Sequence, residues 1–247
     1  MDRLIYTAMT GAKHILEKQA TTSNNLANAT TTGFRAQVDS FRAVPVNGAP
    51  LATRAFVVDS TMGHDFSPGA IQQTGRDLDV AVQGRGWIAV QLEDGSEAYT
   101  RNGSLKLSEN GVLQTQNGVT VQGDAGPIAI PPDVSVSVAK DGTVTAIAAG
   151  FKPGAPTVLG RIKLVNPPEE NLARGDDGLF RLKAGGEAEA DANVALIGGA
   201  LEGSNVNVVD AMVEMISLAR QFEMHMNLLK NAESNATKAG QLLSLTG

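Results

Sequence analysis

Residues 208–229 read VVDAMVEMISLARQFEMHMNLL, and their apolar side chains recur at alternating intervals of four and three. This spacing places them on one face of an α-helix, as in the seam of a coiled coil. The residues of this seam are Val208, Met212, Met215, Ala219, Phe222, Met226 and Leu229. Asn207 and Asp210 resemble a capping box at its start. The pattern predicts a helix over about residues 205–244, which would be about 60 Å long at 1.5 Å per residue.

This helix carries more apolar surface than a single seam requires. The additional large side chains are Val209, Val213, Ile216, Leu218 and Leu228. Each contributes about 1.5–3 kcal/mol when it is buried, and a two-helix hairpin cannot bury all of them. We therefore expect contacts with other subunits. The alternative is that the β domain of the same chain covers this face.

A second helix is predicted over about residues 1–30. Its seam consists of Ile5, Met9, Ala12, Leu16, Gln19, Ser23 and Leu26. Because Gln19 and Ser23 are polar, this helix would be marginal in water by itself. The threonines before Gly33, and Gly33 itself, predict its end. Both terminal helices carry heptad-like seams, so we expect them to pair side by side as a coiled coil.

Between the helices the sequence changes character twice. Residues 34–75 show no clean period and contain several prolines and glycines, so we expect an extended connector. Residues 76–202 carry a turn signal about every ten residues, such as Asn102-Gly103 and Asp141-Gly142. Segments such as 134–138 alternate apolar and polar side chains, as half-buried antiparallel strands do.

The predicted fold class is therefore α+β. Residues 1–33 and 203–247 form terminal helices that pair with each other. Residues 34–75 form the connector, and residues 76–202 form a central, mainly antiparallel β domain. No helical pattern separates the expected strands, which argues against a βαβ fold.

The composition excludes several classes of function. The chain has 247 residues, no cysteine and a net charge of −6 at pH 7. Without cysteine there can be no disulfide, thiolate metal site or cysteine nucleophile. An acidic surface repels phosphate backbones, so nucleic acid is not an expected partner. Charged residues interrupt the apolar character of the N-terminus, and no long apolar run follows, so neither a cleaved signal peptide nor direct membrane insertion is expected.

No group of residues indicates catalysis. His14, His64 and His225 have no ligand partner at metal-binding spacing. Asp77 and Asp79 are most simply solvent-facing acids at the start of a strand. No phosphate-binding loop, nucleophile elbow or dinucleotide fingerprint occurs. We therefore expect no enzyme activity, no catalytic residue, no metal and no cofactor.

Three motifs resemble those of the axial proteins of the bacterial flagellar rod and hook. The first is SNNLANATTTGFR at 23–35, and the second is LEGSNV at 201–206. The third runs from GRDLDVAV at 75–82 through GRGW to YTRNG at 99–103. The residues of the two terminal signatures are Asn24, Asn25, Leu26, Ala27, Asn28, Gly33, Phe34, Arg35, Leu201, Glu202, Gly203, Ser204, Asn205 and Val206.

These motifs lie in family order across the chain, which therefore resembles the flagellar basal-body rod protein family over essentially its whole length. The segments 5–9 and 34–46 are most similar to those of proximal rod subunits, and the distal rod protein is the alternative. The asparagines of the first motif have two possible roles. In one they cap the helix end locally, and in the other their amides bond to neighbouring subunits.

The resemblance implies a structural drive-shaft subunit of the rod in the periplasm. It would be exported unfolded by the flagellar type III export apparatus without a cleaved signal peptide. Its partners would be other proximal rod subunits and the distal rod protein, in a hetero-oligomeric helical assembly. The terminal helices would form an inner tube around the export channel, and the β domain would lie outside. Other candidate functions are a transient rod-assembly or capping factor and a secreted β-rich enzyme.

On this hypothesis the apolar residues of the terminal helices pack against other subunits. The proposed packing residues are Ile5, Met9, Ala12, Leu16, Leu26, Val208, Val209, Met212, Met215, Ile216, Ala219, Phe222, Met226 and Leu229.

Overall fold

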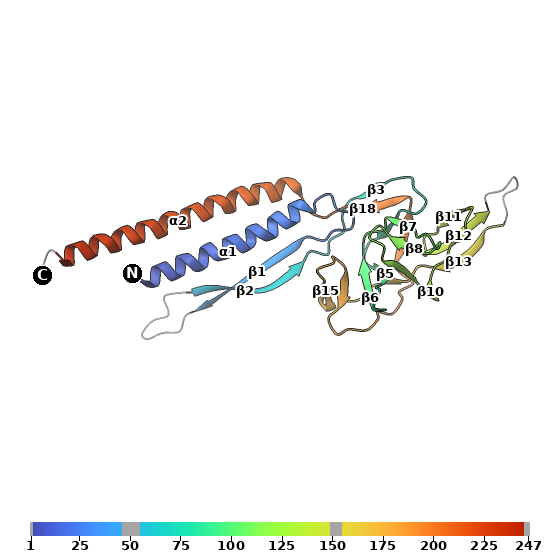
Figure 1. The fold of residues 1–247 in the computed structure, drawn as a ribbon, viewed down its shortest axis with the longest axis horizontal. Helices are drawn as coiled ribbons and strands as arrows, with labels where there is room; N and C mark the ends of the chain where they lie inside the picture. Colours follow the sequence, from blue (N-terminus) through green and yellow to red (C-terminus); the bar gives the residue numbers. More distant parts are fainter. Residues whose placement is uncertain (1, 46–54, 149–154, 245–247) are drawn as a thin grey trace. The chain divides into compact units, whose positions relative to one another are not determined.

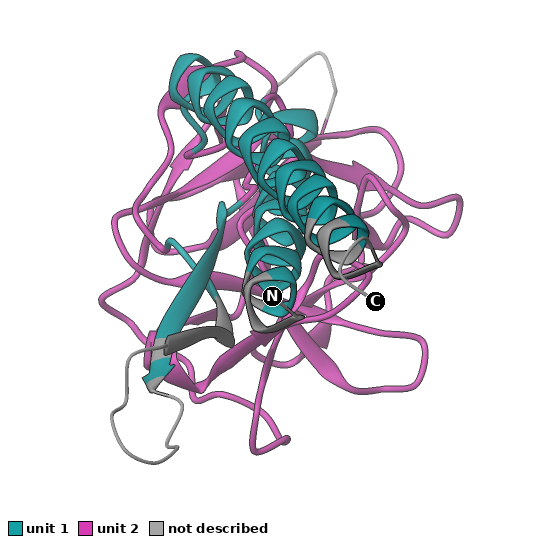
Figure 2. Ribbon diagram, turned by 90° about the vertical axis from the view of Figure 1, so that its left-hand side faces the viewer, with its two compact units in different colours: residues 1–29, 35–65, 206–247 teal, residues 30–34, 66–205 magenta. Residues whose placement is uncertain are grey.

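A computed structural model describes residues 2–45, 55–148 and 155–244 of the chain. The chain divides into two compact units (Figure 2). Unit 1 comprises residues 1–29, 35–65 and 206–247, and unit 2 comprises residues 30–34 and 66–205. The element order is an N-terminal helix, a series of antiparallel strands and a C-terminal helix, which confirms the predicted α+β class.

Unit 1 contains two long helices, α1 (Asp2–Ala27) and α2 (Val208–Ser244). They lie side by side and run in opposite directions, and the last turns of α2 extend past the start of α1 (Figure 1). The side chain of Asn207 caps α2, because its Oδ1 accepts hydrogen bonds from the backbone N–H groups of Val209 (3.0 Å) and Asp210 (3.4 Å). The sequence therefore predicted the start of α2 correctly.

Unit 1 also contains an antiparallel hairpin of β1 (Gln37–Pro45) and β2 (Ala55–His64), which packs beside α1. The register of the two strands shifts between Ser40 and Phe41, as at a β-bulge. A bulge adds one residue to one strand and so reverses the alternation of faces beyond it. This explains why the segment expected to be an extended connector shows no clean two-residue period.

Unit 2 is built of short strands. They are β3 (Ile71–Gln73), β4 (Val80–Gln83), β5 (Trp87–Gln91), β6 (Glu97–Thr100), β7 (Leu105–Leu107), β8 (Leu113–Thr115), β9 (Thr120–Gly123), β10 (Gly126–Pro127), β11 (Val134–Val138), β12 (Thr143–Ala148), β13 (Thr157–Arg161), β14 (Leu164–Val165), β15 (Leu172–Arg174), β16 (Phe180–Leu182), β17 (Ala195–Gly198) and β18 (Ala200–Glu202). A 3-10 helix, Glu169–Asn171, precedes β15.

The largest sheet of unit 2 has the order β15-β16-β6-β5-β9-β8-β7, with β10 paired to β9 and β14 paired to β5. A second sheet has the order β11-β12-β13, and two further ladders pair β17 with β4 and β18 with β3. Each of these pairings is antiparallel, as predicted.

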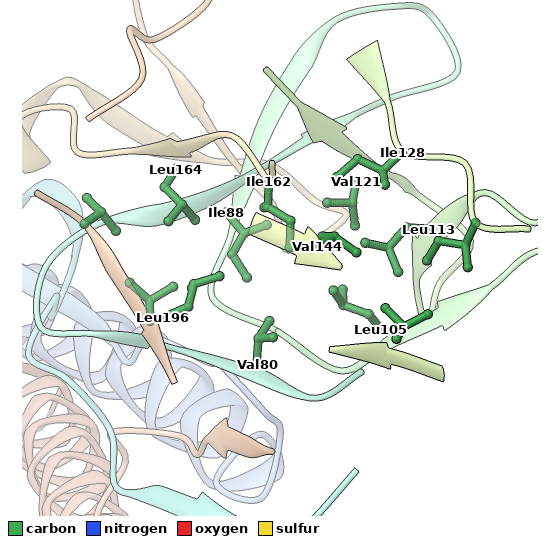
Figure 3. Packing of buried hydrophobic residues seen from close by; sticks show 14 residues of the cluster. Val80, Ile88, Leu105, Leu113, Val121, Ile128, Val144, Ile162, Leu164 and Leu196 are labelled. Carbon is green, nitrogen blue, oxygen red and sulfur yellow. The ribbon is translucent and has the colours of Figure 1, made fainter. Parts of the chain in front are cut away.

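Two clusters of buried side chains form the core of unit 2. The larger one gathers aliphatic residues from strands far apart in the sequence, including Val80, Ile88, Leu105 and Leu196 (Figure 3). The smaller one contains the rings of Trp87 and Phe180, whose centroids lie 4.6 Å apart with their planes inclined at 47°. A chain with little aromatic content thus builds its core mainly from valine, leucine and isoleucine.

Most of the predicted turn glycines adopt the backbone conformation that a tight turn requires. Four of them have a positive φ: Gly95, Gly111, Gly118 and Gly142. The prediction for Asn102-Gly103 was wrong, since Gly103 has no positive φ. Instead its Cα faces the backbone carbonyl of Val80, which leaves no room for a Cβ. Gly103 serves close packing and not a turn.

Candidate assembly surface

The contact between α1 and α2 is made by a stripe of residues that we call the buried seam. On α1 the fully buried members are Ala8, Ala12, Ile15 and Thr22, and on α2 they are Ala211, Leu218 and Ala232. Half-buried residues complete the alternation of four and three, namely Ile5, Gln19 and Leu26 on α1 and Met215, Phe222, His225 and Leu229 on α2.

The buried seam shares every second residue with the predicted one, and its other members lie one position earlier in the sequence. Met9 and Leu16, which the periodicity placed in the seam, are 54% and 49% exposed. In the buried seam, small residues let the two backbones approach each other. At Gly11, a Cβ would lie only 2.6 Å from Cε1 of His225 on the facing helix. Small residues therefore allow a close approach at this point, while Ile15, Leu218 and Phe222 fill other positions of the seam.

Polar contacts line one edge of the seam. The Nζ of Lys18 lies 2.6 Å from Oε1 of Glu214, and the hydroxyl of Thr22 donates to Oε2 of the same carboxylate at 3.4 Å. These groups border a groove between the two helices that the ring of Phe41 from β1 closes on its side. The ring centroids of His14 and Phe41 are 5.6 Å apart in an edge-to-face arrangement. This edge of the helix pair is therefore occupied by the hairpin.

Asn25 of the first signature motif ties α1 to the hairpin. Its Nδ2 donates to the carbonyl oxygen of Gln37 at 2.9 Å, and its Oδ1 accepts from the N–H of Gln37 at 2.8 Å. Asn28 makes a local bond, from its Nδ2 to the carbonyl oxygen of Asn24 at 2.9 Å. Of the two roles considered for these asparagines, Asn28 fills the local one. Asn25 fills neither, since its amide bonds to a strand of its own chain.

Four large apolar side chains on α2 form what we call the outer stripe. They are Val209, Val213, Ile216 and Met224, which are 56% to 66% exposed. Helix positions two residues apart differ by about 200° around the axis, so Val209 and Val213 lie opposite Ala211, and Ile216 lies opposite Leu218. Val209, Ile216 and Met224 therefore face away from α1, whereas Val213 also lines the groove between the two helices. Three members of the stripe, Val213, Ile216 and Met224, line a shallow hollow together with Ser217, Arg220 and Gln221.

A second group of exposed apolar residues lies on α1. Tyr6, Met9 and Leu16 are 64%, 54% and 49% exposed. Asn25 and His14 turn another side of the same helix toward the hairpin. Helix α1 thus has a side against α2, a side against the hairpin and a third side with exposed apolar residues, which we call the α1 stripe.

The proposed packing residues fall into three groups. Ala12 is buried, and Ile5, Leu26, Met215, Phe222 and Leu229 are half-buried. The exposed members are Met9, Leu16, Val208, Val209, Met212, Ile216, Ala219 and Met226. Ala12 aside, sequence reasoning did not single out Tyr6 or the small residues of the buried seam as contact residues.

The signature motifs meet in the interior of unit 2, at an ion pair between Arg101 and Glu202. Nη1 of Arg101 lies 2.8 Å from Oε2 of Glu202, and the two side chains are only 3% and 0% exposed. The arginine comes from the YTRNG motif and the glutamate from LEGSNV. The guanidinium also lies 5.4 Å from the ring centroid of Trp87, in the GRGW motif.

The first signature motif, residues 23–35, also contacts the residues of this ion pair. The N–H of Gly33 donates to the backbone carbonyl of Glu202 at 2.8 Å. Gly33 has a φ of 70°, and its Cα faces the backbone of Arg101 too closely for a side chain. The ring of the next residue, Phe34, lies 4.6 Å from the guanidinium of Arg174. Burial lowers the pKa of Arg174, and the negative charge of Asp177 opposes this shift.

The other signature residues are mostly at intermediate exposure. Phe34 and Arg35 are buried; Asn25, Leu26, Asn28, Gly33, Leu201, Gly203, Ser204, Asn205 and Val206 are half-buried; Asn24 and Ala27 are exposed. Within residues 2–45, 55–148 and 155–244, no group of three or more histidines and carboxylates could hold a metal ion. None of the described helices combines the length and apolarity needed to cross a bilayer.

Three family models match the chain in the order of its regions. Residues 5–35 match the flagella basal body rod protein model, and residues 81–146 match the flagellar hook protein FlgE/F/G D1 domain. Residues 197–242 match the C-terminal model of the flagellar basal body rod FlgEFG proteins.

Named relatives cover the full length. The flagellar basal-body rod protein FlgF of Escherichia coli is 48% identical over 100% of both chains, and that of Salmonella typhimurium is 47% identical over 100% of both. The FlgG protein of Bacillus subtilis is 30% identical over 94% of this chain and 96% of its own. The relatives are thus rod proteins, and the chain belongs to the flagellar basal-body rod protein family, within which it is FlgF-like.

Proposed function

We propose that the chain, a structural subunit of the proximal rod of the flagellar basal body, assembles through the exposed apolar faces of its two helices. The observation that carries this proposal is the outer stripe of α2. Its four side chains are all more than half exposed, and burying a single aliphatic side chain contributes about 1.5–3 kcal/mol. An apolar face of this kind is typical of a surface that another protein covers.

The two exposed stripes suggest the geometry of assembly. The outer stripe belongs to α2, whereas the α1 stripe contains Tyr6, Met9 and Leu16. A contact of one stripe with the other on a neighbouring subunit would be heterologous. A heterologous contact that does not close into a ring generates an open helical assembly, which is the architecture a rod requires.

The pairing of α1 and α2 is proposed to be a coiled coil. Its buried seam keeps the alternation of four and three that a coiled coil requires. The interface between the helices combines apolar with polar side chains, the polar ones being Gln19 and Thr22 on α1 and His225 on α2. The proposed boundaries of the assembling part are residues 1–33 and 203–247, and the proposed packing residues are those of the terminal helices named above.

The proposed setting is the rod in the periplasm, in a hetero-oligomeric assembly with other proximal rod proteins and the distal rod protein. The helices would line the channel through which the flagellar type III apparatus exports subunits, this chain among them, without cleavage of a signal peptide. The full-length likeness to FlgF supports a proximal position more than the weaker likeness to FlgG does.

The test is a double substitution in the outer stripe, Val213→Lys with Ile216→Lys. Two ammonium groups there would have to lose their hydration on assembly, which costs several kcal/mol each when no partner is present. We expect the double variant to fold, by circular dichroism and thermal unfolding, but to be missing from purified basal bodies, and the cells to lose motility.

The matched control is Asn110→Lys with Asn117→Lys, which places two lysines at exposed turns of unit 2 and should leave incorporation unchanged. Normal incorporation of the stripe variant would contradict the proposal. Absence of the unmodified protein from mature basal bodies would instead indicate a capping factor that is discarded after assembly.

A further inference from the structure

The Arg101–Glu202 pair has more partners than an ordinary ion pair. Oε1 of Glu202 accepts from the N–H of Gly69 at 2.8 Å, while Oε2 accepts from Arg101. Nη2 of Arg101 donates to the carbonyl oxygen of Gly84 at 2.6 Å, and Nη1 reaches the carbonyl oxygen of Val82 at 3.4 Å. The ion pair thus joins four backbone segments of unit 2, at residues 69, 82–84, 101 and 202.

Two of the segments at this pair are those where the chain passes between the β strands and the helices. Gly33 follows α1 closely in the sequence, and Glu202 closely precedes α2. They bond to each other through Gly33 N–H and Glu202 O, at 2.8 Å. Further along, the N–H of Asn205 donates to the carbonyl oxygen of Phe34 at 3.4 Å, and its Nδ2 donates to the carbonyl oxygen of Ser67 at 3.1 Å.

We propose that Arg101 and Glu202 are positioning residues that clasp the entering segment, residues 30–34, and the leaving segment, residues 201–205, at one anchored point in unit 2. Desolvating both charges is costly, and a buried pair is often no more stabilising than apolar residues of the same volume. The physical advantage of an ion pair is geometric specificity, since charged hydrogen-bonding groups interact well only within a narrow range of distances and angles. The proposal concerns unit 2 alone and does not depend on how the helices assemble.

Unit 2 supplies a matched comparison. Nζ of Lys163 lies 2.5 Å from Oε2 of Glu97, and these side chains are also largely buried, at 13% and 4% exposure. This second pair bonds to the N–H of Ala188, far from the entering and leaving segments in the sequence. Breaking it removes a comparable ion pair from the same unit without touching the clasp.

The test uses two double variants of the full chain, so that neither leaves an uncompensated buried charge. One is Arg101→Met with Glu202→Leu, and the other is Glu97→Leu with Lys163→Met. Hydrogen–deuterium exchange would be followed at the amides of Gly33 and Gly69, with the amides of β5 as the measure of whether unit 2 is folded.

We expect the clasp variant to exchange about tenfold faster or more at Gly33 and Gly69 with β5 still protected, because local opening needs only the tethering contacts to be lost. The control variant should leave both rates within about twofold of the unmodified chain. Three results would overturn the proposal: unchanged rates in the clasp variant, an equal rise in the control variant, or loss of protection across β5 in the clasp variant.

Discussion

Gly103 sits where the carbonyl of Val80 occupies the space of a side chain. The backbone of Val80 is also held in place at this point, because its N–H donates to the carbonyl oxygen of Gly103 at 2.9 Å. Gly118 is glycine for another reason: it has a φ of 85° with no atom near its missing Cβ. Two glycines in similar Asn-Gly pairs therefore have different physical roles, one steric and one conformational.

These roles predict different costs for alanine. Gly103→Ala must displace a backbone carbonyl next to the core, so we expect a loss of about 3 kcal/mol or more in the free energy of unfolding of unit 2. Gly118→Ala meets open space and should lose only about 1 kcal/mol, from the left-handed backbone conformation. Chemical denaturation followed by the fluorescence of Trp87 would measure both. Equal losses would contradict the steric role of Gly103.

At the scale of elements, the sequence predicted those features of the helices that depend only on residues close together in the chain. The cap at Asn207 and the extent of both helices are local, and the structure confirms them. The stripe that joins α1 to α2 is not local, because it depends on how closely the helices approach. Periodicity selected Met9 and Leu16, which remain exposed, and passed over Ala8 and Ile15, which are buried.

The β1–β2 hairpin shows a second limit at this scale. The register shift at Ser40/Phe41 disrupts the two-residue alternation by which a strand is predicted. Its attachment to α1 through Asn25 depends on a contact between two elements, so no pattern within either one could have predicted it.

Met215 belongs both to the predicted seam and to the buried seam, so it tests the helix pairing itself. Met215→Lys would place a charge at a half-buried position of the contact between α1 and α2, with an expected cost of several kcal/mol on their pairing. We expect the variant to be missing from basal bodies while the thermal unfolding of unit 2 is unchanged. Met215→Leu keeps the volume and should assemble. Normal assembly of the lysine variant would count against the seam.

At the scale of the whole molecule, the signature motifs gain a physical meaning that the sequence did not supply. Residues 33, 101 and 202 are far apart in the chain, yet they meet at one buried ion pair. Sequence comparison marked Arg101 and Glu202 as parts of motifs, but the pairing of their charges is visible only in the fold. The exposed apolar surface was predictable as an excess over one seam, whereas its division into stripes on α1 and α2 was not.

The central claim is that a neighbouring subunit covers the outer stripe in the rod. Because the chain has no cysteine, Ile216→Cys would provide a single thiol on this stripe, with Asn117→Cys at an exposed turn of unit 2 as the control. Maleimide labelling would be compared between the isolated chain and intact basal bodies. We predict that Cys at position 216 is labelled in the isolated chain and protected in the basal body, while the control is labelled in both. Labelling at position 216 that is as fast in intact basal bodies as in the isolated chain would contradict the claim.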